Sequence, residues 1–233
     1  LLYLLTESYN QKELYLYQNI FFDIKKMKMH IWDDLKGHLE IPFRKYAYVK
    51  DSNGQHVSLY GDRLKRVSQF DKDDPTLHES DVPPMTRFLV DQYGDSDEAS
   101  TGHRIMFFDI EVEVTEGFPD VQKAQNPITS IALYDSTTEK YYTYCFDPQK
   151  RIKNYSKDDE IVEFYETEYE MLNKFFQKYL EIRPTIISGW NSEFFDIPYL
   201  YNRAVRVLGP EVANLLSPIS QVIYSEYKKK HTI

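Results

Sequence analysis

The sequence has little of what marks secreted and membrane proteins. Its 233 residues include one cysteine, Cys145, so an internal disulfide is excluded. No apolar run is long enough to span a bilayer, and the apolar start, Leu1 to Leu5, is too short to be a targeting segment. We therefore expect a reducing, cytoplasmic setting and no membrane partner. The first residue is not Met, which predicts that the chain is a fragment of a longer protein.

Several catalytic patterns are missing as well. The sequence has no glycine-rich phosphate loop, no cluster of Cys and His with zinc spacing, and no Ser-His-Asp set with supporting context. Basic residues are outnumbered, with 28 Lys and Arg against 37 Asp and Glu and a formal net charge of −9. Because non-specific affinity for nucleic acids comes largely from Lys and Arg, this balance argues against a protein whose main task is to grip a phosphate backbone. Metal-dependent nuclease sites are the exception, since they concentrate carboxylates and leave charge compensation to cations.

The sequence does contain enough apolar material for one large domain or two small ones, with 42% hydrophobic and 15% aromatic residues. Residues 1–100 alternate short aromatic and β-branched runs with charged turns, which predicts a smaller, β-rich α+β domain. Within it, residues 46–50 and 56–60 flank Asn53-Gly54 and are predicted to form a hairpin. The aromatic residues predicted to pack in its core, rather than to stack on bases, are Phe21, Phe22, Trp32 and Tyr46.

A polar, acidic stretch over residues 91–102 has the composition of a linker. We expect a domain boundary there, with a second domain over residues 101–233.

The second domain is organised around the stretch from Arg104 to Val114, in which four apolar residues lead into Asp109-Ile110-Glu111. The run is typical of a strand, and a strand turns residues i and i+2 to the same face, so Asp109 and Glu111 project together. One common reason to hold two acids side by side is a divalent cation, which prefers oxygen ligands. The alternative is an ordinary amphipathic strand whose acidic row, continued by Glu113, faces solvent.

A third acid, Asp196, follows downstream within Asn191-Ser192-Glu193-Phe194-Phe195-Asp196. An Asp-x-Glu strand followed by Asn-x-x-x-Phe-Asp at the start of a helix resembles the pair of motifs that begins the proofreading exonuclease of family B DNA polymerases. Further similarity lies in residues 79–84 and 87–89 upstream and in Gly117-Phe118-Pro119-Asp120, a form similar to polymerases of T-even-type tailed phages. The resemblance covers about residues 41–208.

The order of elements agrees with the fold that this resemblance implies, a ribonuclease-H-like α/β fold with a mixed sheet. After the acidic strand, residues 128–134 and 141–146 are predicted strands. A helix with a capping box is predicted to start at Thr167 and to end near Arg183, with Leu180 on its apolar face, before Pro184. Residues 185–188 form a further predicted strand and 197–208 a last helix, so the order is strand, strand, strand, helix, strand, helix.

The resemblance implies that Asp109, Glu111 and Asp196 are catalytic and bind two Mg²⁺ ions, with Mn²⁺ as an alternative. Asp196 would also serve as the N-cap of the last helix. The resemblance further implies that Asn191 and Phe118 contact the substrate, the single-stranded 3′ end of a DNA primer. The alternatives are a turn residue for Asn191 and a loop aromatic folded onto the sheet for Phe118. Residues 228–231, Lys-Lys-Lys-His, are either a phosphate contact or a solvated charge run.

The sequence departs from the family pattern in one respect. A complete exonuclease of the family has a third motif, Tyr-x-x-x-Asp, and no match follows Asp196; the pairs Tyr93/Asp97 and Tyr155/Asp159 precede it. The polymerase portion, with palm, fingers and thumb domains, would be the partner that holds DNA.

Three hypotheses therefore stand. The favoured hypothesis is that the chain is the N-terminal and partial exonuclease region of a replicative polymerase. The alternatives are a stand-alone nuclease of the same fold and a non-catalytic nucleic-acid-binding module.

Overall fold

The computed structural model describes residues 17–114, 117–225 and 230–232. The chain divides into two compact units, residues 1–102 and 103–233, which are described separately. Within the described ranges, no helix has both the length and the apolar character needed to cross a membrane.

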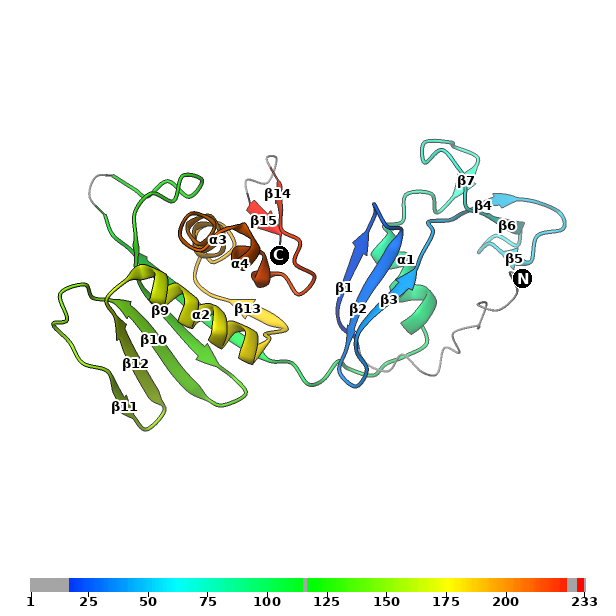
Figure 1. Cartoon of the computed structure of the whole chain (residues 1–233). Coiled ribbons are helices and arrows are strands. Elements are labelled where there is room, and N and C mark those ends of the chain that lie inside the picture. Colours follow the sequence, from blue (N-terminus) through cyan, green and yellow to red (C-terminus); the bar gives the residue numbers. More distant parts are fainter. Residues whose placement is uncertain (1–16, 115–116, 226–229, 233) are drawn as a thin grey trace, which may run out of the picture. The chain divides into compact units, whose positions relative to one another are not determined.

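The first unit contains a three-stranded antiparallel sheet in the order β1-β2-β3 (Figure 1). Its strands are β1 (Tyr17–Asp23), β2 (Lys28–Asp33) and β3 (Gly37–Pro42). Met29 and Ile31 of the central strand are fully buried and pack with Phe88 of the helix α1 (Pro84–Tyr93). Because α1 continues to Tyr93, the first three residues of the predicted linker are helical instead.

The predicted core aromatics of this unit divide between two environments. Phe22 packs against the core and Tyr46 is buried. Phe21 and Trp32 are half-buried on the opposite face of the sheet, beside His30, so their assignment to the core was wrong.

The hairpin predicted around Asn53-Gly54 does not form. A second sheet has the order β5-β6-β4-β7, with β4 (Ala47–Lys50), β5 (His56–Val57), β6 (Arg63–Val67) and β7 (Leu77–His78). The strand β6 lies between the two predicted partners, because Leu64 pairs with Lys50 on one side and His56 on the other. The chain reverses at residues 58–62, where Ser58 and Asp62 are joined by a backbone hydrogen bond.

The second unit is built on a six-stranded mixed sheet in the order β11-β12-β10-β9-β8-β13. Its strands are β8 (Ile105–Val112), β9 (Ile128–Asp135), β10 (Lys140–Phe146), β11 (Tyr155–Lys157), β12 (Glu160–Tyr165) and β13 (Ile186–Ser188). The remaining elements are α2 (Glu168–Ile182), α3 (Asp196–Val207), the short helices α4 (Pro210–Ala213) and 214–216, and the pair β14 (Ile223–Ser225) and β15 (Lys230–Thr232).

This arrangement matches the predicted mixed sheet but not the predicted order. The strands β11 and β12 stand between the third predicted strand and the helix, so the order is five strands, a helix, a strand and a helix. The strand β12 runs parallel to β10, and β13 runs parallel to β8. The strand β11 is only three residues long and polar, whereas β12 contains Ile161, Val162, Phe164 and Tyr165 and was missed although its composition is typical of a strand.

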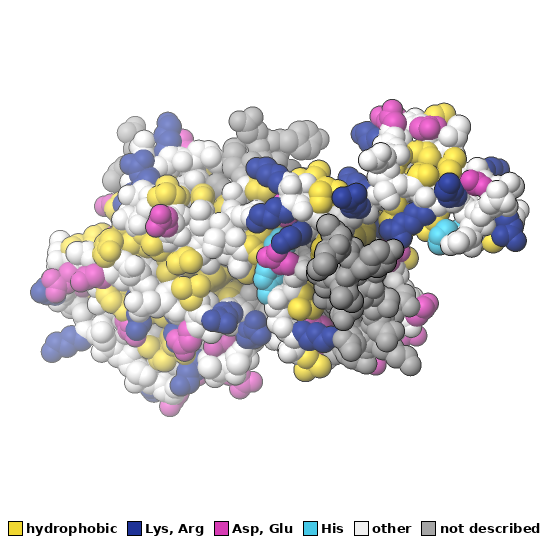
Figure 2. Space-filling view, turned by 45° about the vertical axis from the view of Figure 1, so that its right-hand side comes forward, with side chains coloured by type: hydrophobic (Ala, Val, Ile, Leu, Met, Phe, Trp, Pro, Cys, Tyr) yellow, Lys and Arg dark blue, Asp and Glu magenta, His cyan; other side chains and the backbone are white. Residues whose placement is uncertain are grey.

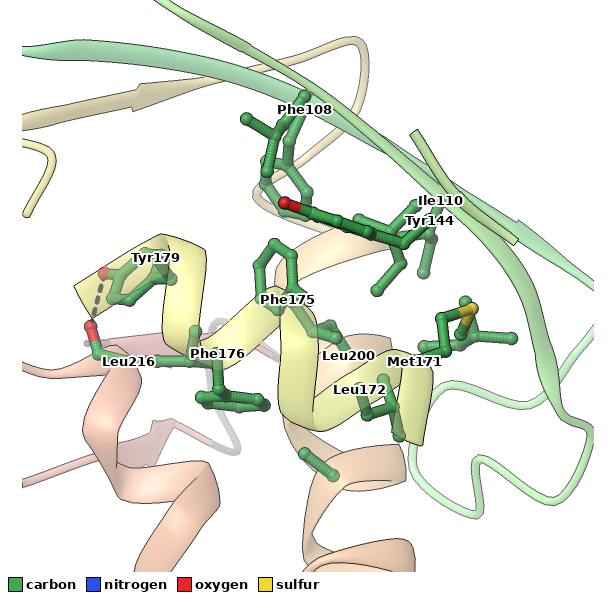
Figure 3. Close-up of a cluster of buried hydrophobic side chains, with 14 of the residues drawn as sticks. Phe108, Ile110, Tyr144, Met171, Leu172, Phe175, Phe176, Tyr179, Leu200 and Leu216 are labelled. Atoms are coloured by element: carbon green, nitrogen blue, oxygen red, sulfur yellow. Dashed lines mark hydrogen bonds between the residues drawn. The ribbon is translucent and has the colours of Figure 1, made fainter. Parts of the chain in front are cut away.

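The core of the second unit lies between the sheet and α2, where Phe108, Ile110 and Tyr144 face the helix (Figure 3). The helix begins as predicted, since the Thr167 hydroxyl accepts a hydrogen bond from the Glu170 N–H at 3.2 Å. Its buried side chains are Glu168, Met171, Leu172, Phe175, Phe176, Tyr179 and Ile182. Leu180, predicted on this face, is 42% exposed. The helix is also tied down by a hydrogen bond of 2.6 Å from the Tyr179 hydroxyl to the Leu216 carbonyl.

Candidate active site

The strand β8 carries two of the predicted site residues. Its side chains alternate, with Met106, Phe108 and Ile110 buried against the core and Asp109 and Glu111 exposed. Both carboxylates therefore project from one face of a strand that is firmly held by its apolar face, as the strand periodicity predicted.

The chain reaches the third acid by passing close to β8. The strand β13 pairs only with residues 105–107, and the chain then turns away at Gly189. A Cβ on Gly189 would lie 2.3 Å from the Phe108 carbonyl oxygen, so only glycine fits this crossing without a shift. Beyond this point β13 offers no partner to the backbone of β8.

Asp196 takes the place of that missing strand partner. Its Oδ1 accepts a hydrogen bond of 3.2 Å from the N–H of Ile110, the residue between Asp109 and Glu111. A buried N–H without a partner is costly, so this bond fixes the carboxylate against β8.

The predicted N-cap role of Asp196 is wrong. The helix α3 begins at Asp196, and the cap position is Phe195, whose side chain makes no capping bond. The carboxylate is oriented by the N–H of Ile110 in β8 together with its own backbone N–H.

The surroundings of Asp196 raise its pKa to about 6, first through burial and then through the negative charges of Asp109 and Glu111. The hydrogen bond from Ile110 acts in the opposite direction. Asp109, Glu111 and Asp196, the carboxylate trio, thus share one electrostatic environment. Their oxygens do not all lie within 4.8 Å of one another, the spacing expected for three ligands of a single ion.

The helix α3 is anchored by polar bonds to the segment after β8. The Tyr199 hydroxyl donates to the Asn126 carbonyl at 2.8 Å, and Asn202 Nδ2 donates to the Val121 carbonyl at 2.9 Å. Arg203 pairs with the buried Glu168 of α2 through two bonds, of 2.8 and 2.5 Å. These bonds tie α3 to residues 121–126 and to α2.

The two predicted substrate residues both contact Phe195, the residue before Asp196. Phe118 is 81% exposed, and its ring packs against Phe195 with centroids 5.3 Å apart. Asn191 is exposed, has a left-handed backbone (φ 60°), and accepts bonds from Phe194 and Phe195 through its carbonyl, so its role as a turn residue is confirmed.

Sequence reasoning missed Trp190, which is 92% exposed beside Asn191. The signal was a large aromatic residue at the start of the turn between β13 and α3, where a core role is least expected. Of residues 228–231, also considered as a phosphate contact, 228 and 229 lie outside the described residues and no side chain of the four is described.

Comparison with family models matches residues 91–230 to the exonuclease domain of DNA polymerase family B. The chain belongs to this family. The family B match includes β8 and the start of α3, and so both segments that carry the carboxylate trio.

Among the curated relatives of this family B chain is the DNA-directed DNA polymerase of Escherichia phage RB69, 32% identical over 136 residues. The DNA-directed DNA polymerase of Enterobacteria phage T4 is 28% identical over 157 residues, and DNA polymerase 1 of Saccharolobus solfataricus is 30% identical over 131. These matches cover 49%, 58% and 56% of this chain. They cover 15%, 17% and 13% of the relatives, so the chain corresponds to a small part of each.

Both signs of charge are present on the visible face of the described residues of this family B chain (Figure 2). Figure 2 shows Lys and Arg side chains interspersed with Asp and Glu over that face. Mixed charge of this kind gives little long-range attraction for a polyanion.

Proposed function

We propose that the chain is the N-terminal and proofreading part of a replicative DNA-directed DNA polymerase, and that its second unit hydrolyses the 3′ end of a DNA primer. The observation that carries this proposal is the hydrogen bond from Ile110 to the Asp196 carboxylate. It joins the two motif segments at a backbone position between Asp109 and Glu111. Membership of the family supports the same reaction.

In this proposal the carboxylate trio holds two Mg²⁺ ions, with Mn²⁺ as an alternative. The donor set fits, because carboxylate oxygens are the ligands that these ions prefer. It fits electrostatically as well. Burial and the negative charges of Asp109 and Glu111 raise the pKa of Asp196, and a nearby cation would favour the ionised carboxylate.

The remaining residues have positioning roles. When bound, the ions would activate a water and stabilise the leaving 3′ oxygen, so no protein nucleophile is needed. The Ile110 N–H holds Asp196 at β8. Phe118, exposed and supported by Phe195, would stack on a base of the frayed primer end, and Asn191 would orient the substrate.

We further propose residues 1–100 as an N-terminal domain and residues 101–233 as an exonuclease domain of the ribonuclease-H-like fold. The mixed sheet, whose hydrophobic core is shared with α2 and α3, supports the ribonuclease-H-like fold. The division of the chain after Gly102 supports the domain boundary. The palm, fingers and thumb of the whole polymerase would hold the DNA, because a chain of net charge −9 attracts it weakly.

The test is degradation of a labelled single-stranded oligonucleotide with Mg²⁺ or Mn²⁺. We compare the 233-residue chain with a longer chain that extends through a Tyr-x-x-x-Asp motif. We expect weak or no activity from the shorter chain, because no Tyr-x-x-x-Asp follows Asp196 in it and its net charge of −9 attracts DNA weakly. The longer chain should be active, and Asp109→Ala should abolish that activity. Glu113→Ala, which removes the next acid of the same exposed row, is the matched control and should leave it unchanged.

Two outcomes would contradict this proposal in different ways. Strong activity in the shorter chain that Asp109→Ala abolishes would favour a stand-alone nuclease. Activity in the longer chain that survives Asp109→Ala, or no activity at all, would exclude the carboxylate trio as the catalytic site.

A further inference from the structure

The first unit carries a group of metal-ligating side chains that the proposed exonuclease does not use. His30, His38 and Glu40, the histidine cluster, place two imidazole nitrogens and a carboxylate oxygen within 4.8 Å of one another. Among the residues that the structure describes, no other three His, Cys, Asp or Glu side chains meet this criterion.

The register of the first sheet explains why these side chains meet. Along the pair β2 and β3, His30 stands opposite Glu40, and Trp32 stands opposite His38. Side chains two residues apart on a strand share a face, so all four lie on one face of the sheet. The intervening residues of β2, Met29 and Ile31, point to the core on the other face.

The two histidine rings already face each other through nitrogen atoms. His30 Nδ1 and His38 Nε2 are 3.0 Å apart, the ring planes differ by 7°, and the centroids are 5.2 Å apart. That centroid separation is about the nitrogen distance plus two ring radii, so the rings meet edge to edge in one plane. One ring therefore donates its N–H to the lone pair of the other.

Packing encloses the His30 ring, whereas the exposed His38 ring is covered on one face and can turn. His30 is 2% exposed and lies beside the ring of Phe21, while Trp32 stacks on His38 with centroids 4.8 Å apart and an interplanar angle of 16°. The other nitrogen of His30, Nε2, is buried and has no hydrogen-bond partner. The polar contact of the His30 ring is therefore made by Nδ1, the nitrogen that faces His38.

We propose that the histidine cluster binds a divalent transition-metal ion, with Zn²⁺ as the best match. Two imidazoles and one carboxylate are a donor set that zinc takes in proteins, with a water as the fourth ligand. Two nitrogens that are each about 2.0–2.1 Å from a tetrahedral ion lie about 3.3 Å apart, close to the 3.0 Å between the histidines. The exposed ring of His38 turns so that the two lone pairs converge, and each ring keeps its one proton on the nitrogen that faces away from the ion.

The ion has one competitor, the ammonium group of Lys28. Lys28 Nζ lies 2.6 Å from Glu40 Oε2, but the two side chains are 40% and 43% exposed. Such an exposed pair contributes little, so the ion displaces it at low cost. Because the ligands come from two neighbouring strands, the bound ion would link β2 to β3 and stabilise the folded first unit by mass action.

The test is calorimetric titration of the 233-residue chain with Zn²⁺, with saturating Mg²⁺ present so that the carboxylate trio is not counted. We expect one Zn²⁺ per chain. His38→Ala and Glu40→Gln alter exposed side chains, and each should weaken binding roughly tenfold or more. Lys28→Met should tighten binding a few-fold by removing the competing charge. His56→Ala, an exposed histidine outside the cluster, is the matched control and should change nothing.

Co²⁺ gives a second readout, since nitrogen ligands in tetrahedral geometry produce strong visible absorption that Zn²⁺ then removes. Circular dichroism of each variant shows that it is folded. Absence of Zn²⁺ binding, or equal binding by His38→Ala and the parent chain, would overturn the proposal. Neither result bears on the exonuclease, which is tested by the loss of oligonucleotide degradation in Asp109→Ala.

Discussion

The carboxylate trio and the histidine cluster are each a set of three proposed metal ligands, but they are assembled over very different lengths of chain. Asp196 bonds to Ile110 across 86 residues, whereas His30 and His38 are eight residues apart on one hairpin. Closing a long loop costs more conformational entropy than closing a short one. The trio must therefore depend on a framework far from its ligands, while the cluster depends on the local pairing of β2 with β3. The predictions below test this difference.

The largest effect is expected from the buried ion pair between α3 and α2. Arg203→Ala leaves the buried Glu168 without its guanidinium partner, and we expect a loss of about 3–5 kcal/mol in the free energy of unfolding. Urea denaturation measures this loss. Arg203 also donates to the carbonyls of Ala124 and Gln125, so Arg203→Lys should recover only part of the stability. A loss below about 1 kcal/mol would mean that this pair is not part of the framework.

The crossing of the chain at Gly189 should also be sensitive. In Gly189→Ala the added Cβ meets the Phe108 carbonyl oxygen, and we expect a loss of about 1–3 kcal/mol in the free energy of unfolding. The backbone must move at residue 189 to accommodate the Cβ, and this displaces the segment that leads to Asp196. The oligonucleotide degradation of the longer chain should therefore fall as well. Ser192→Ala, which removes only the 3.3 Å hydrogen bond from the Ser192 hydroxyl to the Gly189 carbonyl and adds no atom at the crossing, is the comparison variant. Unchanged stability and activity in Gly189→Ala would show that the crossing is loose.

Asp196→Asn should stabilise the protein at neutral pH while removing its proposed activity. The pKa of Asp196 is raised from 3.8 to about 6 in the folded state, so the folded state binds the proton more tightly than the unfolded state does. The stability that this gives is present below pH 3.8 and is lost as the pH rises through about 6. Asparagine still accepts from the Ile110 N–H and carries no charge, so the variant avoids this loss.

We expect Asp196→Asn to exceed the parent chain by about 1–3 kcal/mol at pH 7.5 and by much less at pH 4.5. Urea denaturation at the two pH values measures the difference. Saturating Mg²⁺ should reduce the gap at pH 7.5, because only the parent chain keeps all three ligands. A variant that is less stable than the parent at pH 7.5 would mean that Asp196 is not under electrostatic strain.

The smallest effect is expected in the first unit. Lys28→Met breaks the half-exposed pair with Glu40, and the free energy of unfolding should change by less than about 1 kcal/mol. The same denaturation experiment as for Arg203→Ala makes the two ion pairs directly comparable. A change as large as that of Arg203→Ala would remove the distinction between a local and a long-range framework.

The elements of the second unit that were predicted from the sequence are those with a periodic pattern of apolar residues. The strands β8, β9 and β10 and the helix α2 were found because alternation and helical spacing mark one buried face. The acids were found because their two motifs resemble a known family. The strand β11 was missed because it is three residues long and polar, and it joins the sheet only by pairing with β12. The strand β12, which pairs with β10, was missed although its composition is typical of a strand.

Long-range pairing also accounts for the errors in the first unit. Asn53-Gly54 is a strong hairpin signal, but β6 inserts between its flanking strands because Leu64 pairs with both. The histidine cluster was not foreseen, since it depends on the register that sets His30 opposite Glu40. Likewise, the preference of Asp for helix N-termini suggested that Asp196 is an N-cap, whereas its carboxylate accepts a hydrogen bond from the Ile110 N–H, which has no strand partner on that side.

That last bond makes one amide of the sheet a reporter of the site. The proton of the Ile110 N–H is protected from deuterium exchange by Asp196, which belongs to α3 rather than to a neighbouring strand. Its exchange rate therefore measures how often the first turn of α3 separates from β8 in the folded protein, whereas amides paired with β9 exchange only when the sheet itself opens. The motion of this site can thus be followed at a single backbone position, without substrate and without substitution.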